Sequence, residues 1–130
     1  MINFDDFTKV ELKVGTILEA EEISGSDKLF KLQVDFGLID VIPAEAGIQK
    51  EWIPDQVRDD RQKDIRQILS GIKKWYSPEK LIGKQFVFVT NLEPRIIMGL
   101  ESQGMIMAVG EIKPILLKPA SKVPPGSSVR

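Results

Sequence analysis

The sequence predicts an all-β fold, a small barrel of five strands, and three observations support this. Two long stretches, 11–23 and 29–36, alternate apolar and polar side chains with the period of two that is typical of half-buried strands. Two later stretches, 85–90 and 104–109, are short and apolar, and only one short segment carries helix signals. A chain of 130 residues with 42% hydrophobic content is long enough for one core. We therefore expect a single domain over residues 1–130.

The first half of the chain supplies the clearest strands. The first strand is expected over 11–23, with every second residue from Leu12 to Leu18 on one face. Gly15 within this run predicts a bulge or a sharp coil, because a strand that serves both ends of a small barrel has to bend. After turn residues, the second strand at 29–36 places its charged side chains on one face and buries the other. The buried face holds Phe30, Leu32, Val34 and Phe36.

A short helix separates the remaining strands. A third strand is expected over 66–70, and Ser77 as N-cap with Pro78 at the first helical position then opens a helix that Gly83 ends. Strands at 85–90, 104–109 and, briefly, 115–117 follow, and the Pro- and Ser-rich tail is coil or an arm that covers a sheet edge. This order predicts a five-stranded Greek-key barrel of the OB type, with an SH3-like barrel or a small sandwich as alternatives.

The composition excludes several kinds of chemistry. The chain has no Cys and no His, which removes disulfides, thiolate nucleophiles, histidine bases and most transition-metal sites. We therefore predict a protein that is not an enzyme and that needs no cofactor and no metal. No apolar run approaches the roughly 20 residues of a membrane span, and the N-terminus lacks a signal peptide. A soluble, cytoplasmic protein is expected.

Charge is unevenly distributed along the chain. The net charge is −1, but it divides into −4 over 1–37, −3 over 38–64 and +6 over 65–130. A phosphate backbone responds to the local potential of the face that it meets, so a near-neutral total is compatible with RNA binding. The alternative is that these charges are only a solvated surface.

Three short runs combine turn-forming residues with polar side chains at the ends of strands. They are Ser70-Gly71-Ile72, Asn91-Leu92-Glu93-Pro94-Arg95 and Ser102-Gln103-Gly104-Met105. Loops on a rigid scaffold are common positions for binding residues. The pattern favours a binding surface over a catalytic centre.

Together with four further runs, these motifs resemble a known family. The further runs are Ser26-Asp27-Lys28-Leu29, Tyr76-Ser77-Pro78-Glu79, Leu81-Ile82-Gly83-Lys84 and Pro125-Gly126. In this order they resemble the tRNA-binding OB domain at the C-terminus of bacterial methionyl-tRNA synthetases, which also occurs as free-standing tRNA-binding proteins. The resemblance covers 2–37 and 65–130. It implies a non-catalytic protein that recognises tRNA shape and assists aminoacylation, alongside methionyl-tRNA synthetase. The alternatives are a peptide-binding export chaperone, which is another branch of the fold family, and a generic single-strand binder.

The basic residues near these motifs are expected to form one stripe that contacts phosphates. The stripe contains Lys28, Lys31, Arg66, Lys73, Lys74, Lys84 and Arg95. Ser70, Asn91 and Ser102 carry short polar groups suited to a 2′-hydroxyl or a base edge, and Met105 and Trp75 offer apolar contact to an unstacked base. Several of these residues also have a structural interpretation. Ser70 and Asn91 could stabilise a loop and a turn, Met105 could pack in the core, and Trp75 with Tyr76 could cover the barrel end.

An apolar segment lies between the fourth and fifth strands. It contains Ile96, Ile97, Met98 and Leu100 around Gly99. A loop of this character is expected to be covered. Free-standing proteins that the chain resembles form homodimers, and we predict a homodimer through this segment and the C-terminal arm. The alternative is that the segment folds over the mouth of its own barrel.

The segment 38–64 has no counterpart in the family that the chain resembles, where a short turn joins these strands. Two stretches within it, 41–49 and 52–60, resemble translated palindromic repeat elements that insert into bacterial genes. Loop-closure entropy tolerates such an insertion, because each doubling of loop length costs only about 0.6 kcal/mol. We predict an inserted loop with no role in RNA binding.

Overall fold

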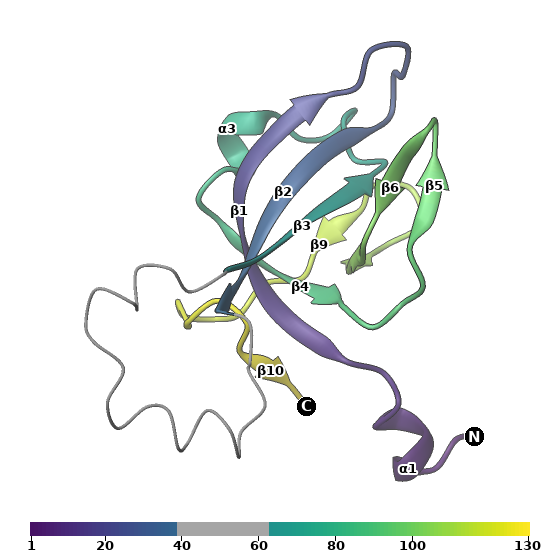
Figure 1. The fold of residues 1–130 in the computed structure, drawn as a ribbon, viewed down its shortest axis with the longest axis vertical. Helices are drawn as coiled ribbons and strands as arrows, with labels where there is room; N and C mark the ends of the chain where they lie inside the picture. Colours follow the sequence, from purple (N-terminus) through teal and green to yellow (C-terminus); the bar gives the residue numbers. More distant parts are fainter. Residues whose placement is uncertain (39–62) are drawn as a thin grey trace.

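The computed structural model describes residues 1–38 and 63–130, and in these ranges the chain forms a curled antiparallel sheet with two short helices (Figure 1). The elements are α1 (Phe4–Phe7), β1 (Leu12–Glu22), β2 (Phe30–Leu38), β3 (Lys63–Ser70), α3 (Pro78–Leu81), β4 (Gln85–Val89), β5 (Arg95–Ile97), β6 (Leu100–Ser102), β7 (Met105–Ile106), β8 (Ala108–Val109), β9 (Ile115–Leu116) and β10 (Ser128–Val129). No helix in the described ranges has the length and apolar character needed to cross a membrane.

The main sheet has the strand order β3-β2-β1-β4-β7, and each neighbouring pair is antiparallel. β1 joins its two halves, because its first residues pair with β4 and its later residues pair with β2. The sheet curls until β3 meets the segment before β7, where the amide of Gln103 donates to the carbonyl of Gln67 at 2.8 Å. The predicted OB-type barrel is thereby confirmed, with α3 between β3 and β4 as expected.

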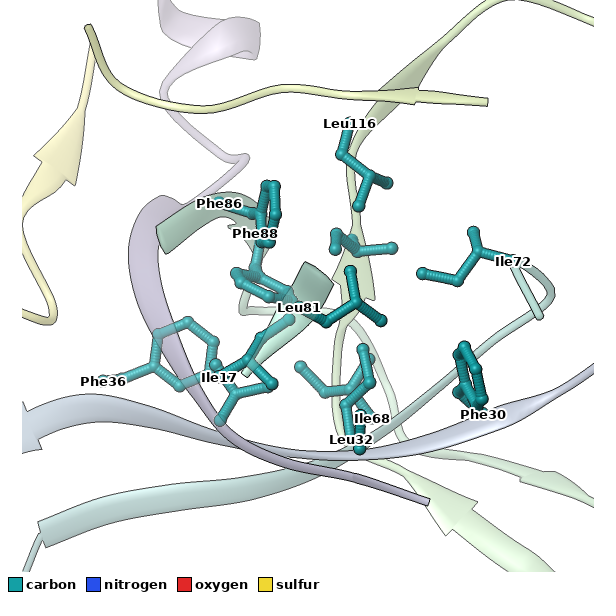
Figure 2. Packing of buried hydrophobic residues seen from close by; sticks show 13 residues of the cluster. Ile17, Phe30, Leu32, Phe36, Ile68, Ile72, Leu81, Phe86, Phe88 and Leu116 are labelled. Carbon is teal, nitrogen blue, oxygen red and sulfur yellow. The ribbon is translucent and has the colours of Figure 1, made fainter. Parts of the chain in front are cut away.

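The barrel interior is filled by apolar side chains from all of these elements. Figure 2 shows residues of β1, β2, β3 and β4 turned toward one cluster, to which Leu81 of α3 also belongs. The predicted inner face of β2 is confirmed, because its four residues are at most 3% exposed. Phe36 and Phe88 pack edge to face with ring centroids 5.3 Å apart. The aromatic side chains of β2 and β4 therefore stabilise the core and do not offer stacking surfaces to a ligand.

The first strand departs from the prediction in one detail. The irregularity in its pairing with β2 lies between Ile17 and Glu19, not at Gly15. Ile17 and Ala20 on either side of it belong to the core cluster, whereas Leu18 is 41% exposed, so the face from Leu12 to Leu18 is not the one that lines the core. Gly15 serves close packing instead, because a Cβ at this position would lie 2.4 Å from Cγ1 of Val34.

Two segments of the second half differ from their predicted structure. The apolar segment after β4 was expected to be a loop, and it is a hairpin of β5 and β6, with positive φ at Met98 and Gly99 in its turn. The strand expected over 104–109 is divided into β7 and β8 at Met107. The amide of this residue still donates to Val87 of β4, at 2.9 Å.

The described ends of the predicted insertion belong to the sheet. Leu38 pairs with Lys63, so β2 and β3 extend further than expected. Asp64 lies within β3. The rest of the predicted insertion lies outside the described residues.

The C-terminal tail is an arm that covers a sheet edge, which was one of its two predicted forms. β10 pairs with β1, and the amide of Gly126 donates to the carbonyl of Val14 at 2.7 Å. The arm approaches β2 so closely that a Cβ on Gly126 would lie 2.1 Å from the carbonyl oxygen of Phe36. The Pro125-Gly126 motif therefore has a structural role in fixing the arm.

Gly126→Ala should destabilise the protein more than Gly83→Ala. Both glycines have positive φ, +87° and +82°, but a Cβ on Gly83 would meet nothing within 4 Å. The free energy of unfolding of the control, Gly83→Ala, should fall by about 1 kcal/mol because of the left-handed backbone alone. That of Gly126→Ala should fall by about 3 kcal/mol because the arm is also displaced. Urea unfolding measures both values, and equal losses would contradict the close approach.

Candidate nucleic-acid interface

The barrel closes along a seam between Gln67–Leu69 of β3 and Ser102–Gly104. The Ser102 hydroxyl accepts from the amide of Leu69 at 3.0 Å and donates to the carbonyl of Gly104 at 3.1 Å. The side-chain carbonyl of Gln103 accepts from the amide of Gln67 at 3.0 Å. Ser102 is only 5% exposed, so its hydroxyl holds the seam together. This places Ser102 as a positioning residue.

A small hollow of about 90 Å³ lies beside this seam, and we call it the seam hollow. It brings together three of the predicted RNA-binding residues, Arg95, Ser102 and Met105, with Glu93 as an acidic neighbour. Met105 is 48% exposed, so it does not pack in the core, which was the alternative for this residue. Arg95 is exposed and forms no ion pair with a described residue. A cation and an apolar side chain therefore stand next to each other at the surface.

A second group, which we call the turn cluster, consists of Lys28, Lys73 and Lys74. The amide of Lys73 donates to the carbonyl of Lys28, and its ammonium donates to the carbonyl of Ser26, both at 3.1 Å. Lys28 and Lys74 are exposed. Ser70 pairs with Phe30 at this same end of β3, next to the seam. The turn cluster and the seam hollow thus lie at one end of β3.

Two of the predicted lysines pair with carboxylates of β1. Lys31 lies 3.4 Å from Glu21, and Lys73 lies 3.1 Å from Glu22. Surface pairs of this kind contribute about 0–1 kcal/mol. Replacing the carboxylate by a phosphate is therefore energetically inexpensive, and both lysines remain suitable for contact with RNA.

Arg66 is held by the protein itself. Its guanidinium donates to both oxygens of Asp64 and, at 2.6 Å, to the carbonyl of Thr90. It also lies over the ring of Phe36, 5.3 Å from the centroid. These contacts occupy the planar group on several sides, so the geometry assigns Arg66 to the fold and we leave it out of the proposed contact surface.

Asn91 is likewise engaged with backbone groups. Its side-chain carbonyl accepts from the amide of Glu11 at 2.8 Å, and its amide group donates to the carbonyl of Lys9 at 2.6 Å. The side chain therefore fixes the entry into β1. This is a structural role, although its partners differ from the turn that the sequence suggested.

Lys84 is separated from the rest of the predicted stripe. It precedes β4, whereas Arg95 follows the other end of this strand. Five extended residues span about 17 Å. Lys84 and Arg95 therefore lie at opposite ends of β4. Lys84 lines a different hollow, near α3.

Several residues of the site escaped the sequence reasoning. Leu92 and Glu93 line the seam hollow, and Gln67 is the partner that gives Gln103 its role. Leu92 and Glu93 belong to the motif Asn91-Leu92-Glu93-Pro94-Arg95, and this position could have identified them as residues of the site. Tyr76 covers the barrel end, which was the structural role expected for it as the alternative to binding. Its hydroxyl donates to the carbonyl of Pro114 at 2.9 Å. Trp75 beside it is 36% exposed.

The fold and this basic, polar end define an OB-type binding barrel. A family model described as "Putative tRNA binding domain" matches residues 55–128, and the chain belongs to this family. The resemblance seen in the sequence is thereby confirmed. Within the described ranges, no group of three or more carboxylates is placed to hold a metal ion.

Individual relatives agree with this assignment. Methionine–tRNA ligase of Methanococcus aeolicus is 43% identical over 129 residues, which are 99% of this chain and 16% of that protein. The enzyme of Caldanaerobacter subterraneus is 41% identical over 98% of this chain and 16% of its own length. The chain thus spans only 16% of the length of these curated relatives.

Solved structures show the same fold. A "MetRS related protein" from Pyrococcus horikoshii is 32% identical with a TM-score of 0.75, over 100% of this chain and 98% of that chain. The "chaperone CsaA" of Bacillus anthracis is 28% identical with a TM-score of 0.74, over 100% of this chain and 99% of that chain.

Ser102→Ala should cost more stability than Ser70→Ala. The first change leaves the buried amide of Leu69 without its acceptor, which costs about 1–3 kcal/mol. Ser70 is half-buried, and its hydroxyl makes no hydrogen bond with a described residue. Ser70→Ala should therefore lower the free energy of unfolding by no more than about 0.5 kcal/mol. Chemical denaturation compares the two variants. A Ser102→Ala protein as stable as the parent would show that the seam does not depend on this hydroxyl.

Proposed function

We propose that the chain is a tRNA-binding module that recognises the shape of tRNA and assists aminoacylation without catalysis of its own. The observation that carries this proposal is the position of the family's motifs, which gather exposed cations at one end of the barrel. The turn cluster and Arg95 flank the seam there, and Met105 adds an apolar surface. Membership of the putative tRNA-binding family supports the choice of ligand.

In this proposal the cations contact phosphates, which fixes the orientation of the RNA without reading its sequence. Lys31 and Lys73 exchange their carboxylate partners for phosphates, whereas Lys28, Lys74 and Arg95 bind directly. The Ser70 hydroxyl is suited to a 2′-hydroxyl, which distinguishes RNA from DNA. Met105 packs against an unstacked base. Ser102 and Asn91 act through the backbone that they hold in place.

We further propose that the module acts with methionyl-tRNA synthetase in the cytoplasm. The support is the set of methionine–tRNA ligases in which a region similar to this chain makes up 16% of the protein. A tRNA-binding barrel that holds the substrate raises its effective concentration at the synthetase.

A second candidate function is peptide binding, as in an export chaperone. The similarity to the chaperone CsaA of Bacillus anthracis supports it. So do the apolar side chains on the β5–β6 hairpin, where Ile96 is 68% and Met98 55% exposed. Apolar surface of this kind suits an extended peptide as well as another protein.

Binding assays with total tRNA and with DNA of equal length distinguish the two functions. If tRNA contacts about 5 phosphates, the logarithm of the binding constant should fall against the logarithm of salt concentration with a slope of roughly −3.5 to −4.5. Binding should be weaker for DNA. Affinity that does not respond to salt, with capture of an apolar peptide instead, would favour the chaperone.

Arg95→Ala and Arg130→Ala form a matched pair within this experiment. Each removes one exposed arginine, but only Arg95 lines the seam hollow. Loss of a phosphate contact should reduce the salt slope by about one in the Arg95 variant and leave it unchanged in the Arg130 variant. Equal effects would show that only total charge matters.

The β5–β6 hairpin is also the proposed homodimer contact, with Ile96, Ile97, Met98 and Leu100. Ile97 and Leu100 are half-buried, so the hairpin also partly covers its own barrel. Ile96→Glu should weaken dimerisation at least about tenfold, because a charge would be buried in an apolar contact. Ile112→Glu is the control, since Ile112 is 87% exposed and lies away from this hairpin in the chain. Sedimentation equilibrium measures both, and an unchanged Ile96→Glu dimer would exclude this contact.

A further inference from the structure

Four lysines surround a second, larger hollow at the end of the barrel where α3 lies. Lys80 and Lys84 approach it from α3 and the start of β4, and Lys118 and Lys122 approach it from the segment after β9. The hollow has a volume of about 630 Å³, and we call it the lysine hollow. It shares no lining residue with the seam hollow.

The walls of the lysine hollow are held together by partly buried hydrogen bonds. The side chain of Gln85 on β4 accepts from the amide of Val123 at 3.0 Å and donates to its carbonyl at 2.6 Å. Tyr76 donates to the carbonyl of Pro114, just before β9. These contacts join segments about forty residues apart in the chain, so the lysines stand on a fixed framework.

The charge of the lysine hollow is uncompensated within the described structure. None of the residues that line it is acidic, and none of its four lysines forms an ion pair with a described residue. The nearby carboxylate of α3, Glu79, is not part of the lining. Hydrogen bonding to its own backbone amide, with a contribution from Ser77, lowers the pKa of Glu79. Four like charges around one concave space produce a positive potential that an anion relieves.

The lysine hollow also has an apolar part. The exposed side chain of Ile115 lines it with Pro119 and Ala120, above the buried Phe86 and Leu116, and Thr16 and Ser121 add hydroxyl groups. Sites for small molecules commonly have volumes of about 300–1,000 Å³ and combine an apolar wall with a few polar groups. A ligand that matches both features carries several negative charges next to a ring.

We propose that the lysine hollow binds a nucleotide, with two or more phosphates on the lysines and the base against the apolar side. The nucleotide is either free or an unpaired nucleotide of a bound RNA. Only the second source rests on the proposed tRNA function. Lys84 then has a role of its own, separate from the interface to which the sequence assigned it.

Isothermal titration of the full chain with ATP, and separately with inorganic tripolyphosphate, tests the proposal. The variant Lys118→Gln/Lys122→Gln removes half of the lysines from exposed positions. It should weaken ATP binding at least about tenfold, because charge-assisted hydrogen bonds to phosphate are lost. The control Lys9→Gln/Arg130→Gln removes the same charge from exposed positions that line neither hollow, and it should change ATP affinity by no more than about twofold. ATP should bind more tightly than tripolyphosphate if the base contacts the apolar side.

Absence of ATP binding, or an equal loss in the two double variants, would overturn the proposal. The source of the nucleotide follows from tRNA affinity in the same variants. Weaker tRNA binding by Lys118→Gln/Lys122→Gln assigns the hollow to a nucleotide of the RNA, and unchanged binding assigns it to a free nucleotide. Because the ATP measurement contains no tRNA, failure of the proposed tRNA function would be seen separately.

Discussion

The hydrogen bonds between β3 and the Ser102–Gly104 segment are the constraint on which the rest of the structure depends. A curled sheet has two edges, and an unpaired edge exposes backbone groups that need partners. Here the amide of Leu69 and both backbone groups of Gln67 find partners across the seam. The closed barrel then encloses one core, and Leu69, Ser102 and Gly104 of the seam also line the seam hollow. Stability and the shape of the proposed binding surface therefore depend on one set of contacts.

Closure of the barrel also determines where the cations are placed. Residues that are scattered in sequence gather at two separate places, the turn cluster with Arg95 near the seam and the lysine hollow near α3. The basic C-terminal half of the chain contributes to both. A net charge of −1 conceals this arrangement. The seam hollow and the lysine hollow share no lining residue, so the two places are distinct surfaces of the barrel.

Much of the fold was predictable from local pattern, and the errors have local physical causes. The alternation of β2 correctly predicted its buried face, and Ser77-Pro78 correctly predicted the start of α3. The bulge in β1 was predicted at Gly15 and lies at Leu18, because one extra residue reverses the faces without changing composition. The β5–β6 hairpin was missed because Met98 adopts a positive φ that is uncommon for its type. Arg66 and Asn91 were assigned to RNA because their partners at Thr90 and Lys9 are distant in sequence.

The sequence by itself determined the fold class, the positions of the longer strands, the helix position, the inward aromatic residues and the family, because these follow from periodicity and from short motifs. Only the tertiary structure decided what the motif side chains do. Ser102, which begins one of the three motifs singled out in the sequence, holds the seam, whereas Arg95 and Met105 remain exposed beside it. A hydroxyl that closes a barrel and one that contacts RNA have the same local sequence signal. They differ only in which backbone amide lies within hydrogen-bonding distance, and folding of the whole sheet sets that distance.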